Sequence, residues 1–241
     1  MTTQPLIQLQ GIKKVFYTED LETSALCDID VTIGQGEYVS VSGPSGCGKS
    51  TLLSVLGLLH TATEGKYILN GSDVTDLHSK EQASVRNRQI GFIFQAFNLI
   101  PDMTAFENVE LPLTYRDDLN RKSRRDLVMS ALEQVQMSER QKHFPAQLSG
   151  GQQQRVAIAR AMVGRPKVLL ADEPTGNLDS KNAHLIMDLL AGLHGQGSTI
   201  VMVTHDQRFA ELADRQVSLF DGKIVDDRSV RPSAKVVETV A

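Results

Sequence analysis

The chain has 241 residues, of which 41% are hydrophobic, and carries a formal net charge of -4. This size and composition predict a folded domain with a sizeable core and exclude a disordered chain. The small acidic charge argues against a protein dominated by nucleic-acid binding, so we expect no nucleic-acid partner. No apolar run reaches the ~18 residues of a membrane span, and residues 1–10 lack the pattern of a signal peptide. Cys27 and Cys47 have neither metal-ligand nor disulfide spacing, and they favour a reducing cytosol.

Alternating apolar and polar residues predict the first strands of the chain. They indicate strands at residues 6–10 and 25–33, with residues 15–17 ending the first strand region, and a buried strand at 37–42. We expect a small antiparallel β subdomain packed beside a larger core. Either Phe16 or Tyr17 offers a flat face for a base, and an aromatic side chain that only covers the sheet edge fits as well.

Residues 43–51 fit the phosphate-binding pattern G-x-x-x-x-G-K-[ST], between the buried strand and a predicted helix at 51–56. Glycines permit backbone conformations in which successive N–H groups turn toward an anion, and a helix N-terminus favours negative charge. Lys49 supplies a mobile charge for the β- and γ-phosphates, and the Ser50 hydroxyl is suited to Mg²⁺. The predicted nucleotide-binding residues of this loop are Gly43, Pro44, Ser45, Gly46, Cys47, Gly48, Lys49, Ser50 and Thr51.

The middle of the chain changes from strands to helices. Residues 65–71 predict a hairpin that turns at Asn-Gly, and a short polar helix at 79–88 precedes a strand at 90–94. Helical spacing of apolar residues follows at 104–113 and at 121–137, where Leu127, Val128, Ala131, Leu132 and Val135 are expected to face inward. The basic residues at 121–125 are interpreted as a solvated helix face.

In the stretch Leu148-Ser-Gly-Gly-Gln-Gln-Gln-Arg155, Ser149 and two glycines are followed by a predicted helix at 152–162. It offers bare N–H groups and the Ser149 hydroxyl at a helix N-terminus, as a second phosphate site does. A helix cap without a ligand is the alternative. A second site without lysine suits a chain that completes the nucleotide pocket of a neighbouring molecule.

The last third alternates strands and helices, which predicts a parallel sheet with βαβ crossovers. Strands are expected at 167–171 and 198–203, helices at 181–194 and 207–213, a hairpin at 217–225 and a loosely held polar tail from Asp226. The first of these strands ends in Asp172 and Glu173. In a phosphate-loop protein the first acid is placed to bind Mg²⁺, and the second is placed to act as general base toward a water.

Together these motifs resemble the full set of ATP-binding cassette (ABC) ATPases. Residues 43–51 correspond to Walker A, Gln95 to the Q-loop, 148–155 to the signature, 168–173 to Walker B, 177–179 to the D-loop and His205 to the H-loop. Residues 91–101, 107–112 and 171–179 resemble the branch of macrolide exporters, lipoprotein-releasing ATPases and antimicrobial-peptide exporters. Asn177 and Cys47 stand where serine is commoner in this family.

The resemblance implies roles for residues that are ambiguous alone. Phe16 would stack on adenine, with Tyr17 as a one-residue alternative. Gln95 would touch Mg²⁺ or the attacking water, and His205 the γ-phosphate. The residues expected to reach ATP across a head-to-tail homodimer are Ser149, Gly150, Gly151 and Gln152, with Asp179 along the same interface. The implied catalytic residues are Glu173, His205, Gln95 and Lys49, and the implied metal ligands are Ser50, Gln95 and Asp172.

The expected architecture is an α/β fold with a P-loop NTPase (RecA-like) core, an antiparallel β subdomain and an inserted helical subdomain. Residues 1–95 and 165–225 would form the core with its β subdomain, 96–164 the helical subdomain, and 226–241 the tail. The implied function is that of a cytoplasmic ATPase subunit that dimerises around two Mg²⁺-ATP. It would drive an integral membrane permease, and the permease would dock in a groove of this chain that is bordered by the segment Ala96–Phe106. The alternatives are a soluble cassette protein of DNA repair or translation, and a small-molecule kinase.

Overall fold

The computed structural model describes residues 5–17 and 22–230. Its N-terminal part is a four-stranded antiparallel sheet of order β2-β1-β4-β5. The strands are β1 (Ile7–Tyr17), β2 (Glu22–Ile33), β4 (Glu64–Leu69) and β5 (Ser72–Asp73). Asn70 and Gly71 both have positive φ in the turn between β4 and β5, which confirms the predicted hairpin.

A second sheet has six strands in the order β10-β9-β3-β8-β7-β6. Five of them run parallel and β10 pairs antiparallel to β9 at the edge. The strands are β3 (Tyr38–Ser42), β6 (Ile90–Ile93), β7 (Val168–Asp172), β8 (Thr199–Val203), β9 (Arg215–Phe220) and β10 (Lys223–Ser229). Because β3, β6, β7 and β8 are parallel, the loops that follow them open at one edge of the sheet.

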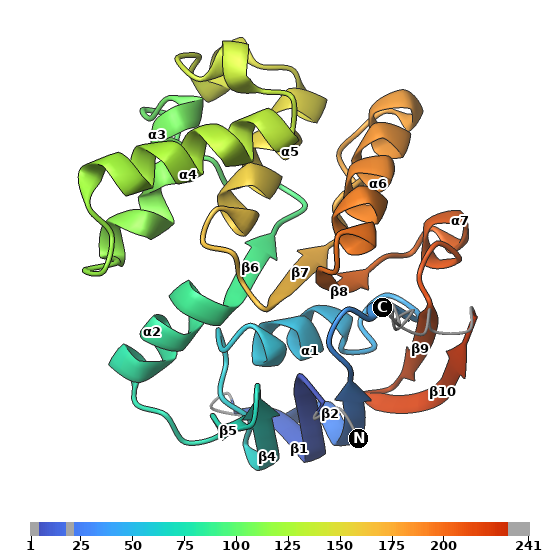
Figure 1. Ribbon diagram of the computed structural model, residues 1–241. Coiled ribbons are helices and arrows are strands. Elements are labelled where there is room, and N and C mark those ends of the chain that lie inside the picture. The colour runs from blue at the N-terminus through green and yellow to red at the C-terminus, as the bar shows by residue number, and fades with distance from the viewer. Residues whose placement is uncertain (1–4, 18–21, 231–241) are drawn as a thin grey trace, which may run out of the picture.

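Helix α1 lies between the two sheets, whereas α3, α4 and α5 gather at the far end of β6 and β7 (Figure 1). The helices are α1 (Lys49–Leu56), α2 (Ser79–Gln89), α3 (Ala105–Glu110), α4 (Arg121–Gln134), α5 (Gly150–Met162), α6 (Ser180–Gly195) and α7 (Gln207–Ala210). Within the described ranges, no helix combines the length and the apolar character needed to cross a bilayer.

Alternation along β7 divides the apolar interior into two cores. Val168 and Leu170 belong to the core shared with α1 and the antiparallel sheet. Leu169 and Ala171 belong to the core shared with α3, α4, α5 and α6. All four are buried, so both faces of the central sheet are covered, and this explains the continuous apolar run of the sequence here.

The predicted elements are present, but many of their ends differ by a few residues. The helix expected at 104–113, for example, is α3 followed by the 3-10 helix Leu111–Tyr115. Helix α4 ends at Gln134 rather than at residue 137, and α7 ends at Ala210 rather than at 213. The loosely held tail expected from Asp226 is wrong for residues 226–229, because β10 continues to Ser229. Its polar side chains obscured the strand, which is held instead by ladder pairing and by Arg215, whose Nε and Nη2 contact both oxygens of Asp227 at 2.6 Å. Residues 231–241 of that expected tail lie outside the described residues.

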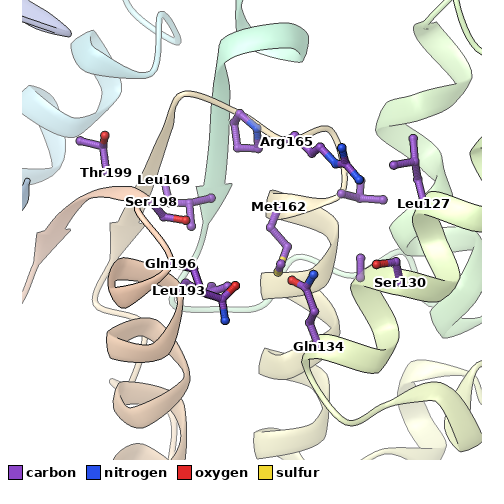
Figure 2. Close-up of a pocket in the computed structure, with 13 residues that line it drawn as sticks. Leu127, Ser130, Gln134, Met162, Arg165, Leu169, Leu193, Gln196, Ser198 and Thr199 are labelled. Carbon is purple, nitrogen blue, oxygen red and sulfur yellow. The ribbon is translucent and has the colours of Figure 1, made fainter. Parts of the chain in front are cut away.

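A cavity of about 410 Å³ opens where α4, the end of α5 and the end of α6 meet. Figure 2 shows Ser130 and Gln134 of α4 and Met162 of α5 on one side of it, facing Leu193 and Gln196 on the other. Its floor contains residues from the first positions of β7 and β8, so it lies at the opposite edge of the sheet from the loops described next. None of the predicted site residues lines it.

Candidate nucleotide-binding site

The phosphate loop joins β3 to α1 and is held from two sides by backbone. Gly48 has φ +102°, and a Cβ added to it would lie 2.4 Å from the Ala25 carbonyl oxygen of β2. Gly46 has φ +79°, and a Cβ there would meet no atom within 4 Å. These two positions need glycine for different reasons, one for close packing and one for backbone conformation beside open space.

The turn of the β9–β10 hairpin lies between the loop and β2. The Cys27 N–H donates to the Gly222 carbonyl at 2.8 Å, and the Gly222 N–H donates to the Cys47 carbonyl at 3.0 Å. The phosphate loop is thus fixed by a segment far along the chain as well as by its own sequence.

Lys49 is the first residue of α1 and is only 8% exposed. Its Nζ donates to the carbonyl oxygens of Gly43 at 2.8 Å and of Pro44 at 2.7 Å. These bonds hold the ammonium group across the loop, beside the N-terminus of the helix. Both features place positive potential where a phosphate chain would lie.

A cavity of about 430 Å³ lies over this loop. Its wall combines the phosphate loop with residues of β2 and with two side chains from the ends of β7 and β8. The lining residues are Thr23, Ser24, Ala25, Gly43, Ser45, Gly46, Gly48, Lys49, Ser50, Thr51, Glu173 and His205. The structure therefore brings most of the predicted Walker A residues, the predicted base and the predicted H-loop histidine around one space.

Asp172 ends β7, next to Lys49 and Ser50 at the start of α1. Burial, followed by the charge of Glu173, raises the pKa of Asp172, while a hydrogen bond from Ser50 and the charge of Lys49 act in the opposite direction. A carboxylate that is desolvated and beside a second carboxylate is suited to a cation. No three His, Cys, Asp or Glu side chains of residues 5–17 and 22–230 gather as a metal cluster, so Mg²⁺ here would rely on Ser50, Asp172 and phosphate oxygens.

Glu173 has an unusual backbone for a residue with a side chain, with φ +44°. Its N–H donates to the Val203 carbonyl at 3.0 Å, which fixes the bend after β7. The bend turns the carboxylate toward the cavity, where Oε2 lies 3.2 Å from Nδ1 of His205. A carboxylate next to an imidazole, both beside the phosphate loop, is an arrangement able to orient and deprotonate a water.

Gln95 follows β6 and is exposed, but it does not line the phosphate-loop cavity. Its carbonyl accepts a hydrogen bond from Asn177 Nδ2 at 3.0 Å, and its side chain packs on Gly176. The sheet places it beside the strand of Asp172, because Ile93 of β6 pairs with Ala171 of β7. Its predicted metal and nucleotide contacts stay predictions.

The predicted signature residues lie elsewhere on the chain surface. Ser149 caps α5 in a reciprocal arrangement, since its N–H donates to Gln152 Oε1 at 3.0 Å and its hydroxyl accepts from the Gln152 N–H at 3.4 Å. Ser149, Gly151 and Gln152 line a separate cavity of about 560 Å³, together with Asn182 of α6. Neither they nor Gly150 line the phosphate-loop cavity of the same chain.

Asp179 caps α6 next to this second cavity. Its carboxylate accepts from the Asn182 backbone at 2.8 Å and side chain at 2.7 Å, and these bonds lower the pKa of Asp179. A Cβ on Gly151 would lie 2.4 Å from Asn182 Oδ1, so the starts of α5 and α6 pack tightly. The predicted signature and D-loop residues therefore form one continuous surface.

Phe16 and Tyr17 end β1 and are 37% and 68% exposed. The Phe16 ring has the Lys14 ammonium 5.0 Å from its centroid and the His60 ring at 5.6 Å, edge to face. Neither residue lines the phosphate-loop cavity. The contacts favour Phe16 as the more fixed of the two aromatic faces, and the base-stacking role stays a prediction.

Sequence reasoning missed two polar residues that hold the site's loops. Gln154 is fully buried in α5, and its Nε2 donates to the Pro174 carbonyl at 2.7 Å. Arg160, on the same helix, donates to the carbonyls of Phe97 and Asn98. A run of glutamines and a helical arginine resemble surface residues in a sequence, so only the three-dimensional contacts reveal them.

Comparison with known proteins places these motifs in a family. Residues 26–176, more than half of the chain, match the family model described as ABC transporter. This chain belongs to the ABC transporter family. The ABC assignment, the P-loop fold class and the ATP-hydrolysing function predicted from the sequence are confirmed, and a soluble DNA-repair ATPase is set aside.

Curated relatives of this ABC ATPase are similar over most of its length. The uncharacterized ABC transporter ATP-binding protein YknY of Bacillus subtilis is 48% identical over 220 residues, which span 91% of this chain and 95% of that protein. The macrolide export ATP-binding/permease protein MacB of Brucella melitensis is 46% identical over 231 residues, 96% of this chain but 36% of that protein. The chain thus spans about a third of its MacB relatives.

Two solved structures of the cassette MJ0796 share the fold, each with a TM-score of 0.86 over 94% of this chain and 99% of that one. They are 41% and 42% identical in sequence. One is described as a dimeric post-hydrolysis state bound to ADP and Pi, and the other as a dimeric bacterial ABC transporter cassette. Both descriptions apply to MJ0796 itself.

Proposed function

We propose that this ABC ATPase forms a head-to-tail homodimer around two Mg²⁺-ATP, and that closure and reopening of the dimer drive a separate membrane permease. One observation carries the proposal. The phosphate-loop cavity and the Ser149–Gln152 surface occupy different parts of the same chain. Each is half of a nucleotide site, so a second copy has to supply the missing half. The dimeric MJ0796 cassettes support this arrangement by similarity.

Within one half-site the residues divide the work of binding and hydrolysis. Lys49 and the N–H groups of the phosphate loop hold the β- and γ-phosphates, and Phe16, or alternatively Tyr17, faces the base. Ser50 and Asp172, with Gln95, hold Mg²⁺, which neutralises phosphate charge when bound. Glu173 takes a proton from the attacking water, and His205 orients the carboxylate and contacts the γ-phosphate.

In the dimer, Ser149, Gly150, Gly151 and Gln152 present their hydroxyl and N–H groups to the γ-phosphate on the opposite chain, with Asp179 beside them. The N-terminus of the 13-residue helix α5 adds favourable potential for that anion. Closure therefore depends on ATP, because the signature surface gains its anion only when the partner's phosphate loop is loaded. Loss of the γ-phosphate removes the shared ligand and reopens the dimer.

The permease would dock in a groove next to residues 96–106. A cavity of about 340 Å³ lies between α2, β6 and the 3-10 helix Leu111–Tyr115, and it is lined by Phe92, Phe94, Leu111 and Tyr115 among others. Residues 96–106 do not line it themselves. Arg160 lines it too, while donating to the carbonyls of the Q-loop residues Phe97 and Asn98. A helix of the permease seated there would touch the segment that leads back to Gln95.

We also propose that the transport direction is export or release, and that the chain works on the cytoplasmic face of the membrane. The MacB relatives are named as macrolide exporters that join the ATPase to a permease in one chain. Co-purification of this chain with an integral membrane protein supports the proposal. Recovery of all of the chain in the membrane-depleted fraction, without a membrane protein bound, contradicts it.

The variant Glu173→Gln tests the mechanism. It removes the base and keeps the size of the side chain, so hydrolysis should fall by about 10²–10⁴-fold while ATP binding and an ATP-bound dimer persist. Size-exclusion chromatography with light scattering, with and without Mg²⁺-ATP, measures the dimer. If this variant hydrolyses ATP at the parental rate, the assignment of the base is wrong.

Mixed dimers test the shared site. One chain carries Ser149→Ala in its signature, and the other carries Lys49→Ala in its phosphate loop. In the trans arrangement both defects fall on the same site and the other site keeps all its residues. The mixture should then retain hydrolysis that neither variant shows alone, whereas equal inactivity of all three preparations contradicts the shared site.

A further inference from the structure

The loop after Glu173 runs beside the end of β6, and two amide side chains join them. Gly176 N–H donates back to the Glu173 carbonyl at 2.9 Å, so the loop doubles over immediately after the base. The Q-loop residue Gln95 follows β6, the strand that pairs with β7. The two loops belong to different motifs and share no backbone hydrogen bond among those of the described residues. Beyond the pairing of β6 with β7, side chains therefore hold the two loops together.

Gln154 of α5 makes the inner contact. It is 0% exposed, and its Nε2 donates to the Pro174 carbonyl at 2.7 Å and points to the Phe94 carbonyl at 3.4 Å. Because both neighbours are carbonyl oxygens, only the NH₂ end of the amide can face them. Its Oε1 is buried without a hydrogen-bond partner in the described part of the chain.

Asn177 makes the outer contact from the loop itself. Its Nδ2 donates to the Gln95 carbonyl at 3.0 Å, one residue beyond the carbonyl that Gln154 faces. Gly176 packs on the Gln95 side chain so closely that a Cβ would lie 2.6 Å from Nε2. The peptide groups of Phe94 and Gln95 are thus contacted by two amides, one from the helix that begins with the signature and one from the loop that follows the base.

We propose that Gln154 and Asn177 form a clasp, defined by these two residues, that positions Glu173 and Gln95 relative to the start of α5. The proposal rests on the proposed function of Glu173 as base. Neither residue touches the phosphate-loop cavity, so both are positioning residues that act through backbone carbonyls. The clasp makes the geometry of the base depend on the seating of the signature helix. A chain whose α5 is displaced would then hold ATP without hydrolysing it.

Three variants of the purified 241-residue chain test the clasp. Gln154→Met keeps the length of the side chain and removes both donated hydrogen bonds. Asn177→Ser shortens the outer donor. Gln216→Met is the matched control, because Gln216 is a buried glutamine of β9 that is bonded to Arg228 Nη2 at 3.1 Å, far along the sheet from β6.

We expect Gln154→Met to lower kcat at least tenfold while KM for ATP changes less than threefold, and Asn177→Ser to lower kcat by three- to tenfold. The double variant should lose little more than Gln154→Met alone, because both act on the same pair of loops. Gln216→Met should match the parent. Thermal melting of each variant separates loss of folded protein from loss of turnover. A parental kcat for Gln154→Met, or a kcat loss equal to that of Gln216→Met, overturns the clasp.

The variant Gln154→Glu gives a readout that packing alone does not move. Its carboxylate would face two carbonyl oxygens, whereas the protonated acid can donate one hydrogen bond to Pro174. Its kcat relative to the parent, measured on protein shown to be folded at each pH, should therefore rise as the pH falls from 8.5 to 6. A ratio that stays constant over this range overturns the clasp.

Glu173→Gln is assayed in parallel to separate the two proposals. A large loss in Glu173→Gln with a parental rate in Gln154→Met rejects the clasp and leaves the base in place. A parental rate in Glu173→Gln rejects the base, whatever Gln154→Met does.

Discussion

Alanine at Gly46 and at Gly48 should separate the two demands that the phosphate loop makes on its backbone. Both residues have positive φ, so either substitution costs roughly 1–2 kcal/mol of conformational strain. Only at Gly48 would the new Cβ also meet backbone, 2.4 Å from the Ala25 carbonyl oxygen. Displacing that backbone adds about 1–3 kcal/mol, by analogy with overpacking in a core.

The expected loss of stability is therefore about 1–2 kcal/mol for Gly46→Ala and about 2–5 kcal/mol for Gly48→Ala. In a domain of this size 1 kcal/mol lowers Tm by roughly 2–4 °C, so Tm should fall by about 2–8 °C and 4–20 °C respectively. Differential scanning calorimetry without nucleotide makes this comparison, and the pair controls for the strain that both share.

For nucleotide binding, Gly46→Ala should be the more damaging of the two substitutions. The Cβ of Gly46→Ala points into open space over the phosphate loop, where phosphate oxygens are expected, so the rise in Tm on adding Mg²⁺-ATP should be lost despite a nearly parental fold. If Gly46→Ala proves as unstable as Gly48→Ala, the Ala25 contact does not carry the cost, and the reasoning fails.

Three further predictions concern positions outside the phosphate loop. Gly192 lies on the exposed side of α6, and a Cβ added there would have no atom within 4 Å. Gly192→Ala should therefore raise the free energy of unfolding by about 0.5–1 kcal/mol and raise Tm; a lower Tm contradicts this prediction. Asp172→Asn should stabilise the Mg²⁺-free protein at pH 7, because burial and Glu173 raise the pKa of Asp172 and its ionised form opposes folding. That gain should disappear as the pH falls and the parental Asp172 becomes protonated, and urea unfolding in EDTA at several pH values measures it; a gain that grows in acid refutes it. Tyr67→Phe removes the hydroxyl that donates to the Leu56 carbonyl at 2.9 Å, so stability should fall by about 1–2 kcal/mol with hydrolysis by the folded protein unchanged.

The secondary structure was largely predictable because the spacing of apolar residues and the positions of turn residues agree along this chain. The buried strand β7 reads as a continuous apolar run, and the helix α4 as a polar stretch with apolar residues at helical spacing. The first part of β10 was predicted as a hairpin strand, but its last four residues were missed because Asp226–Ser229 carries no apolar alternation. Its pairing depends on Arg215, a residue eleven or more positions earlier, which no local pattern can show.

The site was predictable as motifs but not as contacts. Lys49, Glu173 and His205 were expected near a phosphate, and they do meet around one cavity. The buried state of Gln154 was not foreseen, since glutamine is usually exposed and three glutamines in a row resemble a helix surface. Only the direction of α5 toward the ends of β6 and β7 brings its amide to Phe94 and Pro174.

The hydrogen bonds at Gly222 have a consequence for how the site comes into being. Residues 43–51 are synthesised early, but the turn that links Cys27 and Cys47 follows about 170 residues later. A nascent chain holds the phosphate-loop sequence without the backbone that shapes it. We therefore expect ATP affinity to appear only once the β9–β10 hairpin has docked, so that an incomplete cassette emerging from the ribosome would not sequester nucleotide.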